Sequence, residues 1–340
     1  EIGGIFALTG YGAAWGNAEV RAVQLVIDEI NEQGGINGEK VILIIEDSQT
    51  QSIGVVNAFN KLVEHDQVKY VIGATWEAGT TTIVPLAVNQ KIVLVSPSSY
   101  KGIQDANSKY LFSTYPPYGY EIASVKNFYE KQGWQNYAVI YNGEFFSEVT
   151  KNVFLEEAKN AGWNVTVVLE QETTDQDYRT ILLKIKEKNV DAIYAPLAKD
   201  DPAKGQLMKQ MKELNLNIPV ISTSSTESSS LLKNYGLVLD GLYYAFPLDA
   251  PGYQEFRQKY YLKYGVEPES PSAATAYDAA NLLIGALKEG QTVDEVSEYL
   301  HLVRDYDGAS NVISFDERGI VSNKEYKVKT VRNGKFVDAN

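Results

Sequence analysis

The side chains best suited to binding chemistry are aromatic rings and one carboxylate in loops that follow predicted strands. Trp15 stands with Tyr11 in the first loop, and Trp76 and Glu77 follow the apolar run at residues 70–73. Ring faces attract cations and a carboxylate pairs with their charge, so this set suits an amine or a quaternary cation. Rings also stack on flat or sugar-like neutral ligands. We expect Trp15 and Trp76 to contact a ligand.

Each of these residues also has a purely structural explanation. Core packing would account for Trp15 and Trp76 without any ligand. A carboxylate in the first turn of a helix stabilises the helix N-terminus, which would account for Glu77. Ser98 and Ser224 are equally suited to capping helices and to donating hydrogen bonds to a ligand.

Signals of catalysis are missing from the sequence. His65 and His301 are the only histidines, and nothing in the sequence pairs His65 with a nucleophile. The serine-hydrolase elbow, the phosphate-binding loop and the zinc-protease helix motif are all absent. Without cysteine, thiol catalysis, disulfides and cysteine-ligated metal sites are excluded. The sequence predicts a binding protein that is not an enzyme and uses no cofactor or metal.

The elements that position these residues read as repeated strand–helix units. Short apolar runs are separated by amphipathic segments of one helix's length, which is typical of parallel βαβ units with right-handed crossovers. In open parallel sheets, ligands bind beyond the carboxyl ends of the strands. The predicted strands are Lys40–Asp47, Tyr70–Gly73, Ile92–Val95, Tyr137–Tyr141, Val190–Tyr194 and Ile218–Ile221.

Two domains are the default for this chain, because 340 residues are many for a single hydrophobic core. The repeat falters where a strand near Tyr110 runs into Pro116 and Pro117, which cannot continue a central strand. A second strand ends in prolines over residues 242–251. We interpret both places as crossings between domains, so that several short connectors form a hinge.

Composition narrows the classes of partner. The net charge is −13, and no run rich in lysine or arginine occurs, so binding to nucleic acid is not expected. No apolar run approaches the ~20 residues needed to span a bilayer. The absence of cysteine fits an exported protein. The chain begins at Glu1 without methionine, so we expect a trimmed mature form whose export signal is not in this sequence.

An ordered series of motifs extends along almost the whole chain. It opens with FALTG at residues 6–10 and DEIN followed by GGING at residues 28–38, and it ends with AYDA at 276–279 and ISFDERG at 313–319. This series resembles the type I periplasmic, or extracytoplasmic, solute-binding proteins of ABC transporters for branched-chain amino acids.

The resemblance implies an α/β fold of two flavodoxin-like, doubly wound lobes joined by a multi-segment hinge. Lobe 1 would contain residues 1–115 and 248–325, and lobe 2 would contain residues 116–247 and 326–340. A ligand would bind in a cleft between the lobes and be enclosed by hinge closure.

The resemblance also carries site positions over to this chain, with departures. Glu77 and Tyr100 align where leucine-type members place a serine and a threonine against the ligand carboxylate. Leu197 and Ser224 align with the tyrosine and glutamate that bind the ligand ammonium, although Thr223 or Ser225 could take the latter place. The standard clamp for an α-amino acid is therefore not visible. The predicted ligand contacts are Trp15, Trp76, Glu77, Ser98, Tyr100, Phe146, Leu197 and Ser224, followed by Tyr11 and Tyr118.

The function that the resemblance implies is solute capture for an ABC importer. We expect a monomer that binds a small polar metabolite, amino-acid-like or amine-bearing, and presents it to a membrane permease. The protein would act outside the cytoplasm, in the periplasm or as a cell-surface lipoprotein. The alternative is a ligand-sensing or regulatory domain on the same fold that signals to a partner.

Overall fold

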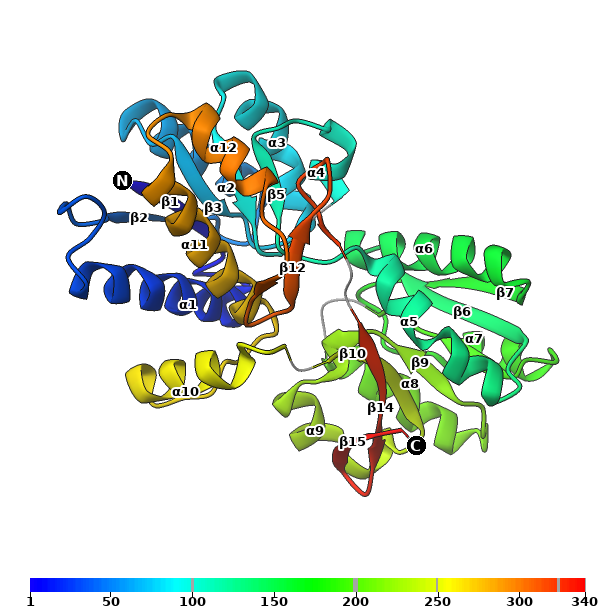
Figure 1. Cartoon of the computed structure of the whole chain (residues 1–340). Coiled ribbons are helices and arrows are strands. Elements are labelled where there is room, and N and C mark those ends of the chain that lie inside the picture. Colours follow the sequence, from blue (N-terminus) through cyan, green and yellow to red (C-terminus); the bar gives the residue numbers. More distant parts are fainter. Residues whose placement is uncertain (99–100, 198–200, 249, 323–324, 340) are drawn as a thin grey trace. The chain divides into compact units, whose positions relative to one another are not determined.

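The computed structural model describes residues 1–98, 101–197, 201–248, 250–322 and 325–339. The chain divides into two compact units (Figure 1). Unit 1 contains Glu1–Pro117 and Asp249–Lys324, and unit 2 contains Tyr118–Leu248 and Glu325–Asn340. The chain therefore passes from one unit to the other three times.

Unit 1 is built on a five-stranded, fully parallel sheet with the order β2-β1-β3-β4-β5. Because β1 lies between β2 and β3, the chain first adds β2 on one side of β1 and then adds β3, β4 and β5 on its other side. This order is that of a flavodoxin-like doubly wound sheet. The strands are β1 (Ile2–Phe6), β2 (Leu43–Asp47), β3 (Tyr70–Gly73), β4 (Val93–Ser96) and β5 (Leu111–Ser113).

Helices cover both faces of this sheet. On one face, α1 (Ala13–Glu32) packs along α11 (Ser272–Glu289), and α10 (Tyr253–Tyr264) and α12 (Val293–His301) flank this pair (Figure 1). A second group of helices packs together against the other face, separate from α1 and α11. It comprises α2 (Ser52–Asn60), the π-helical turn η1 (Lys61–His65), α3 (Glu77–Gln90) and α4 (Lys101–Ala106).

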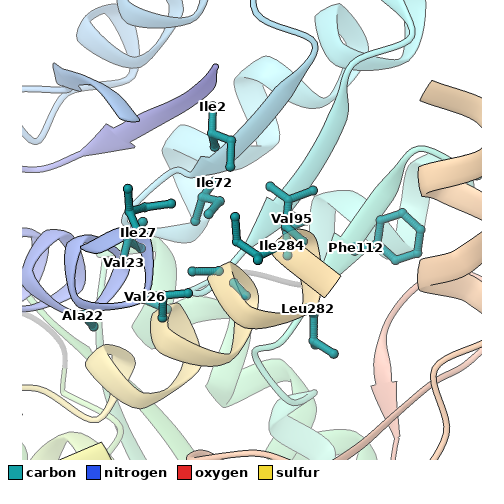
Figure 2. Packing of buried hydrophobic residues seen from close by; sticks show 14 of the residues in the cluster. Ile2, Ala22, Val23, Val26, Ile27, Ile72, Val95, Phe112, Leu282 and Ile284 are labelled. Carbon is teal, nitrogen blue, oxygen red and sulfur yellow. The ribbon is translucent and has the colours of Figure 1, made fainter. Parts of the chain in front are cut away.

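The core of unit 1 lies between the sheet and the pair formed by α1 and α11. Figure 2 shows side chains of this core from α1 (Val23), from α11 (Ile284) and from the strands (Ile72 and Val95). Ile72 and Val95 come from neighbouring strands and are fully buried. Burial of one such side chain stabilises the fold by about 1.5–3 kcal/mol.

Unit 2 repeats the same strand order with two additions. Its parallel strands run in the order β7-β6-β8-β9-β10, and β14 and β15 continue the sheet in antiparallel fashion. The strands are β6 (Asn136–Asn142), β7 (Asn164–Gln171), β8 (Ala192–Tyr194), β9 (Val220–Ser222), β10 (Leu242–Pro247), β14 (Tyr326–Arg332) and β15 (Lys335–Asp338).

Alternation along β6 explains the two cores of unit 2. Tyr137 and Val139 point into an aromatic core beneath α5 (Tyr118–Lys131) and α6 (Phe145–Ala161), and Ala138 and Ile140 point into an aliphatic core on the other face. That other face carries α7 (Arg179–Lys186), α8 (Asp201–Glu213), α9 (Ser229–Tyr235) and the short 3₁₀ turn η3 (Gly236–Leu239). A second 3₁₀ turn, η2 (Ser224–Thr226), follows β9 and contacts β10.

A small antiparallel sheet completes unit 1 with β11 (Tyr306–Asp307), β12 (Val312–Phe315) and β13 (Val321–Ser322). Its loop is held by Asp278 of α11, whose carboxylate accepts hydrogen bonds from the backbone N–H groups of Ala309 and Ser310, both at 2.7 Å. These bonds fix the C-terminal part of unit 1 to α11.

The structure confirms the predicted parallel α/β pattern and differs in detail. All six predicted strands are present, but β1 and β7 were not predicted. β1 contains two glycines, and β7 is an edge strand whose residues are mostly exposed or half-buried, so neither forms an uninterrupted apolar run of branched residues. The prediction that Trp15 lies in a loop was wrong, because α1 already begins at Ala13.

The early start of α1 depends on Gly16. A Cβ atom at this position would lie 2.2 Å from the carbonyl oxygen of Ala7, in the loop after β1. We expect Gly16→Ala to destabilise the protein by roughly 1–3 kcal/mol, because backbone atoms must move to accept the methyl group. Urea unfolding measures this change.

Gly285 of α11 provides the matched control. A Cβ atom there would have no neighbour within 4 Å, so Gly285→Ala should stabilise the protein by up to about 1 kcal/mol. Equal destabilisation by both substitutions would contradict the close approach of α1 to the loop after β1.

Candidate functional site

The topology of unit 1 selects one edge of its sheet for binding. The connection after β1 leads to α1 on one face, and the connection after β3 leads to α3 on the other face. Because neighbouring strands send the chain to opposite faces, a crevice opens beyond their carboxyl ends, and this is where open α/β sheets bind ligands. The segments at this point are residues 7–12 and 74–76, and residues 97–98 after β4 lie beside them in strand order.

Three predicted residues form a ring cluster at this edge, which we define as Tyr11, Trp15 and Trp76. The ring centroids of Trp15 and Trp76 are 5.2 Å apart, and those of Tyr11 and Trp76 are 6.3 Å apart. Both tryptophans are half-buried, and Tyr11 keeps 62% of its surface exposed. The cluster therefore presents ring surface to solvent instead of filling a core.

The backbone of Trp76 is held in an unusual conformation. Its φ of 79° is in the positive region that non-glycine residues rarely adopt, which costs on the order of 1–3 kcal/mol. Thr80 fixes this turn, because its hydroxyl bonds to the backbone of both Ala74 and Trp76. The indole lies directly over Gly12, where a Cβ atom would approach Nε1 to 2.4 Å. Strain held in this way is typical of binding and catalytic sites.

A buried glutamate joins the segments of the unit 1 site. Glu19 of α1 has no exposed surface, and its carboxylate accepts hydrogen bonds from the hydroxyls of Thr75, at 2.5 Å, and Ser98. The hydroxyl of Thr75 in turn accepts the N–H of Ala7 at 3.2 Å. Ser272, at the start of α11, also bonds to this carboxylate. One side chain thus connects the segments after β1, β3 and β4.

The environment of Glu19 changes its acidity. Burial raises its pKa to about 7, although the three hydroxyl groups favour the charged form and limit the rise. Glu19 was not among the residues predicted from the sequence. The available signal was its position, since it shares the buried face of α1 with Ala22 and Val23.

Glu77 and Ser98 make contacts within unit 1. Oε1 of Glu77 accepts the backbone N–H of Gly102 at 3.0 Å, so this buried carboxylate caps the neighbouring helix α4. Ser98 is buried and donates to Glu19. Both residues stand at the predicted edge, and the contacts seen for them are structural. Tyr100 lies outside the described residues.

The corresponding edge of unit 2 lies between β6 and β8, whose connections lead to α6 and α8 on opposite faces. Phe146 follows β6 and meets Tyr118 edge to face, with ring centroids 5.4 Å apart and planes at 90°. Phe146 is half-buried and Tyr118 is buried. Leu197 follows β8 and is fully buried in the aliphatic core, so it has no exposed surface with which to touch a ligand.

Ser224 bonds to the carboxylate of Glu121, a residue that was also not predicted from the sequence. The backbone N–H of Ser224, at the end of β9, donates to Oε1 of Glu121 at 3.2 Å. Glu121 occupies the first turn of α5 and is only 8% exposed. Burial raises its pKa to about 8, and the bond from Ser224 opposes this rise.

Aromatic rings and buried carboxyl groups arranged in this way can hold a small solute. Among the described residues, no group of three or more acidic or histidine side chains is placed to hold a metal ion. The same part of the chain contains no helix of the length and apolarity required to cross a bilayer. The class indicated is a solute-binding protein with a doubly wound α/β fold.

Comparison with known proteins identifies the family. A family model described as periplasmic binding protein matches residues 1–335, and the chain belongs to this family. Curated relatives include the Leu/Ile/Val/Thr-binding protein of Salmonella typhimurium, which is 23% identical over 96% of this chain and 90% of its own length. A Leu/Ile/Val-binding protein of Rhizobium johnstonii is 24% identical over 99% of this chain and 93% of its own.

Solved structures show the same fold. A branched-chain amino acid transporter substrate-binding protein of Streptococcus pneumoniae, solved with isoleucine, has a TM-score of 0.85 at 24% identity and covers 98% of this chain and 97% of its own. A leucine-binding protein of Thermotoga maritima has a TM-score of 0.86 at 23% identity, with 100% and 97% covered. A solute-binding protein of R. palustris, solved with benzoate, has a TM-score of 0.83 at 16% identity, with 99% and 94% covered.

These findings confirm the predicted family resemblance and the type I periplasmic binding protein fold. They also confirm a solute-binding protein that is not an enzyme. The relatives differ in the solutes that their names and titles state, which range from aliphatic amino acids to benzoate.

The acidity of Glu19 predicts a specific dependence of stability on pH. Folding raises the pKa of Glu19 from 4.5 to about 7, so its contribution to the unfolding free energy is fully present below pH 4.5. This contribution is lost as the pH rises through about 7. Between pH 5 and pH 8 the wild type should lose about 2.5 kcal/mol of unfolding free energy relative to Glu19→Gln. Urea unfolding at both pH values measures the difference.

Glu32→Gln is the control, since Glu32 is an exposed glutamate on the same helix. Its unfolding free energy should follow that of the wild type at both pH values. If Glu19→Gln also followed the wild type, Glu19 would not be titrating in a buried environment.

Proposed function

We propose that this protein is the extracytoplasmic solute-binding component of an ABC importer. It binds a small polar metabolite, amino-acid-like or amine-bearing, and closes on it by a hinge motion. The observation that carries the proposal is the ring cluster, which places two tryptophans and a tyrosine at the β1/β3 edge where a sheet of this order binds ligands.

The relatives favour this role. Their names state binding of leucine, isoleucine, valine and threonine, and one related structure is described as the substrate-binding protein of a branched-chain amino acid transporter. A periplasmic family also agrees with action outside the cytoplasm. We propose a monomer that delivers its solute to a membrane permease.

Hinge closure is favoured by the path of the chain. Three passages between two compact units make a connection that can bend while it limits twisting. Closure is a shift of population, because a solute that contacts both units stabilises the closed state over the open one.

The site residues divide into two roles under this proposal. We assign ligand contact to Tyr11, Trp15 and Trp76 of unit 1 and to Tyr118 and Phe146 of unit 2. Glu77 and Ser98 support the unit 1 segments through the contacts described above, and Ser224 contributes through its backbone. Leu197 shapes the unit 2 edge from within the core, and Tyr100 remains a predicted contact.

A thermal-shift screen of the ligand-stripped protein tests the function. The panel contains amino acids, amines and quaternary cations, sugars and nucleosides. At a hundredfold excess over Kd, a true ligand should stabilise the protein by about 2.7 kcal/mol and raise its melting temperature accordingly. If no compound shifts the melting temperature, solute capture is contradicted and the sensing alternative gains support.

Trp76→Ala tests the ring cluster. Alanine keeps the Cβ atom, so the cost of the positive φ is retained while the stacking surface is lost. We expect affinity for the best compound of the panel to fall at least tenfold, because ring contact contributes about 1–3 kcal/mol. The melting temperature of the unliganded protein should change little, since Trp76 is half-buried. A large loss of stability with unchanged affinity would make Trp76 a packing residue.

A further inference from the structure

Glu121 is a buried carboxylate with little to stabilise its charge. It is 8% exposed, and within the described part of the chain it receives one hydrogen bond, from the backbone N–H of Ser224. Among the ion pairs of the described residues, none involves Glu121. A buried carboxylate normally needs a cation or several hydrogen bonds to offset its lost hydration.

Glu227, a partly buried glutamate of the same unit, provides a comparison because protein groups bond to its carboxylate. Its Oε1 pairs with Nζ of Lys329 at 2.5 Å, and its Oε2 accepts the hydroxyl of Tyr244 at 2.5 Å. Both oxygens are therefore satisfied by the protein. No described residue gives Glu121 such an arrangement, so its carboxyl group can pair with a cation from outside.

The surroundings of Glu121 are aromatic. Tyr118 lies one helical turn earlier on α5, so the two side chains share a face of the helix. Tyr118 packs edge to face against Phe146, which follows β6 at the binding edge of unit 2. A carboxylate beside aromatic rings at the carboxyl ends of parallel strands combines charge pairing with cation–π attraction.

We propose that Glu121 is the residue of unit 2 that binds the positively charged group of the solute, with Tyr118 and Phe146 as the adjoining ring wall. Because this assignment builds on the proposed function, it narrows the solute to compounds that carry an ammonium or quaternary ammonium group. It also assigns the cation to unit 2 and leaves Glu77 as the cap of α4.

Acidity offers an independent readout of this role. Burial raises the pKa of Glu121 to about 8, so near neutral pH its carboxyl group is mostly protonated. A bound cation favours the ionised form and releases the proton. Among the described residues, the titratable groups that interact with Glu121 are Tyr129 and Tyr194. Burial raises the pKa values of both tyrosines well above their usual value, so both stay neutral below pH 9.

Matched probes separate charge from shape. Choline is compared with 3,3-dimethylbutan-1-ol, and 3-methylbutylamine with 3-methylbutan-1-ol, while L-leucine is compared with 4-methylpentanoate. Binding of each probe is measured by titration calorimetry for the wild type, Glu121→Gln and Glu130→Gln. Glutamine keeps an oxygen for the N–H of Ser224, and Glu130 is an exposed glutamate on the same helix.

We expect at least one cationic probe to bind the wild type and Glu130→Gln equally, and to bind Glu121→Gln at least tenfold more weakly. For the wild type, affinity for that probe should rise about tenfold between pH 6 and pH 7 and about fivefold between pH 7 and pH 8. For Glu121→Gln it should stay constant. Glu121→Asp keeps a titrating carboxyl group, so its affinity for the probe should still rise with pH, and this readout does not depend on the glutamine variant.

The opposite results are distinguishable. If a cationic probe binds Glu121→Gln as tightly as the wild type, this assignment is overturned while solute binding stands. If only the neutral or anionic probes bind, the assignment is again overturned and the proposed function survives. If neither these probes nor any compound of the wider panel binds, the proposed function fails and this assignment fails with it.

Discussion

The divergence of chain connections at the β1/β3 edge is the constraint on which the site in unit 1 depends. β1 and β3 pair in parallel, but α1 and α3 leave toward opposite faces of the sheet. Neither helix can cover the carboxyl ends of both strands, so side chains there remain partly exposed. Tyr11, Trp15 and Trp76 occupy this place, and Glu19 holds the adjoining segments together from below. Unit 2 repeats the constraint between β6 and β8.

Three glutamates lose their hydration on burial, and their carboxylates differ in the hydrogen bonds that replace it. Glu19 is surrounded by hydroxyl groups, Glu77 caps the amide end of α4, and Glu121 receives a single N–H. For Glu19 and Glu121 burial is the dominant cause of the raised pKa. Glu121 has fewer hydrogen bonds than Glu19 to favour its charge. Hydrogen-bond supply therefore separates a positioning carboxylate from one that is suited to meet a cation.

The fold could be predicted from the sequence because its signal is local. A run such as Tyr137–Tyr141 is apolar on both faces, as is typical of a strand that is covered on both sides. An amphipathic segment of helix length separates each run from the next. β7 could not be found in this way, because an edge strand is largely exposed. The start of α1 was also missed, since it depends on the approach of Gly16 to the backbone of Ala7, which no local pattern encodes.

The candidate site was less accessible to sequence analysis, and the reason is physical. Trp76 could be found because it follows a predicted strand, and Tyr11 and Trp15 because they follow the chain's opening motif. Glu19 and Glu121 lie on the buried faces of helices, where a single polar residue looks like an interruption of the apolar stripe. Their roles depend on partners 56, 79 and 103 residues away along the chain. Such pairs become visible only when the sheets are assembled.

The protonation of Glu121 also explains how the unliganded protein can keep this side chain buried. Near neutral pH the carboxyl group is mostly neutral, so the fold does not carry the full cost of an unpaired buried charge. On the proposed assignment, the arriving cation replaces the proton, and the total charge at the site is nearly conserved. Part of the binding energy is spent on releasing that proton, so affinity is lowest where the carboxyl group is fully protonated. A neutral molecule of the same shape gains nothing from this exchange, and the buried carboxyl group therefore discriminates by charge instead of size.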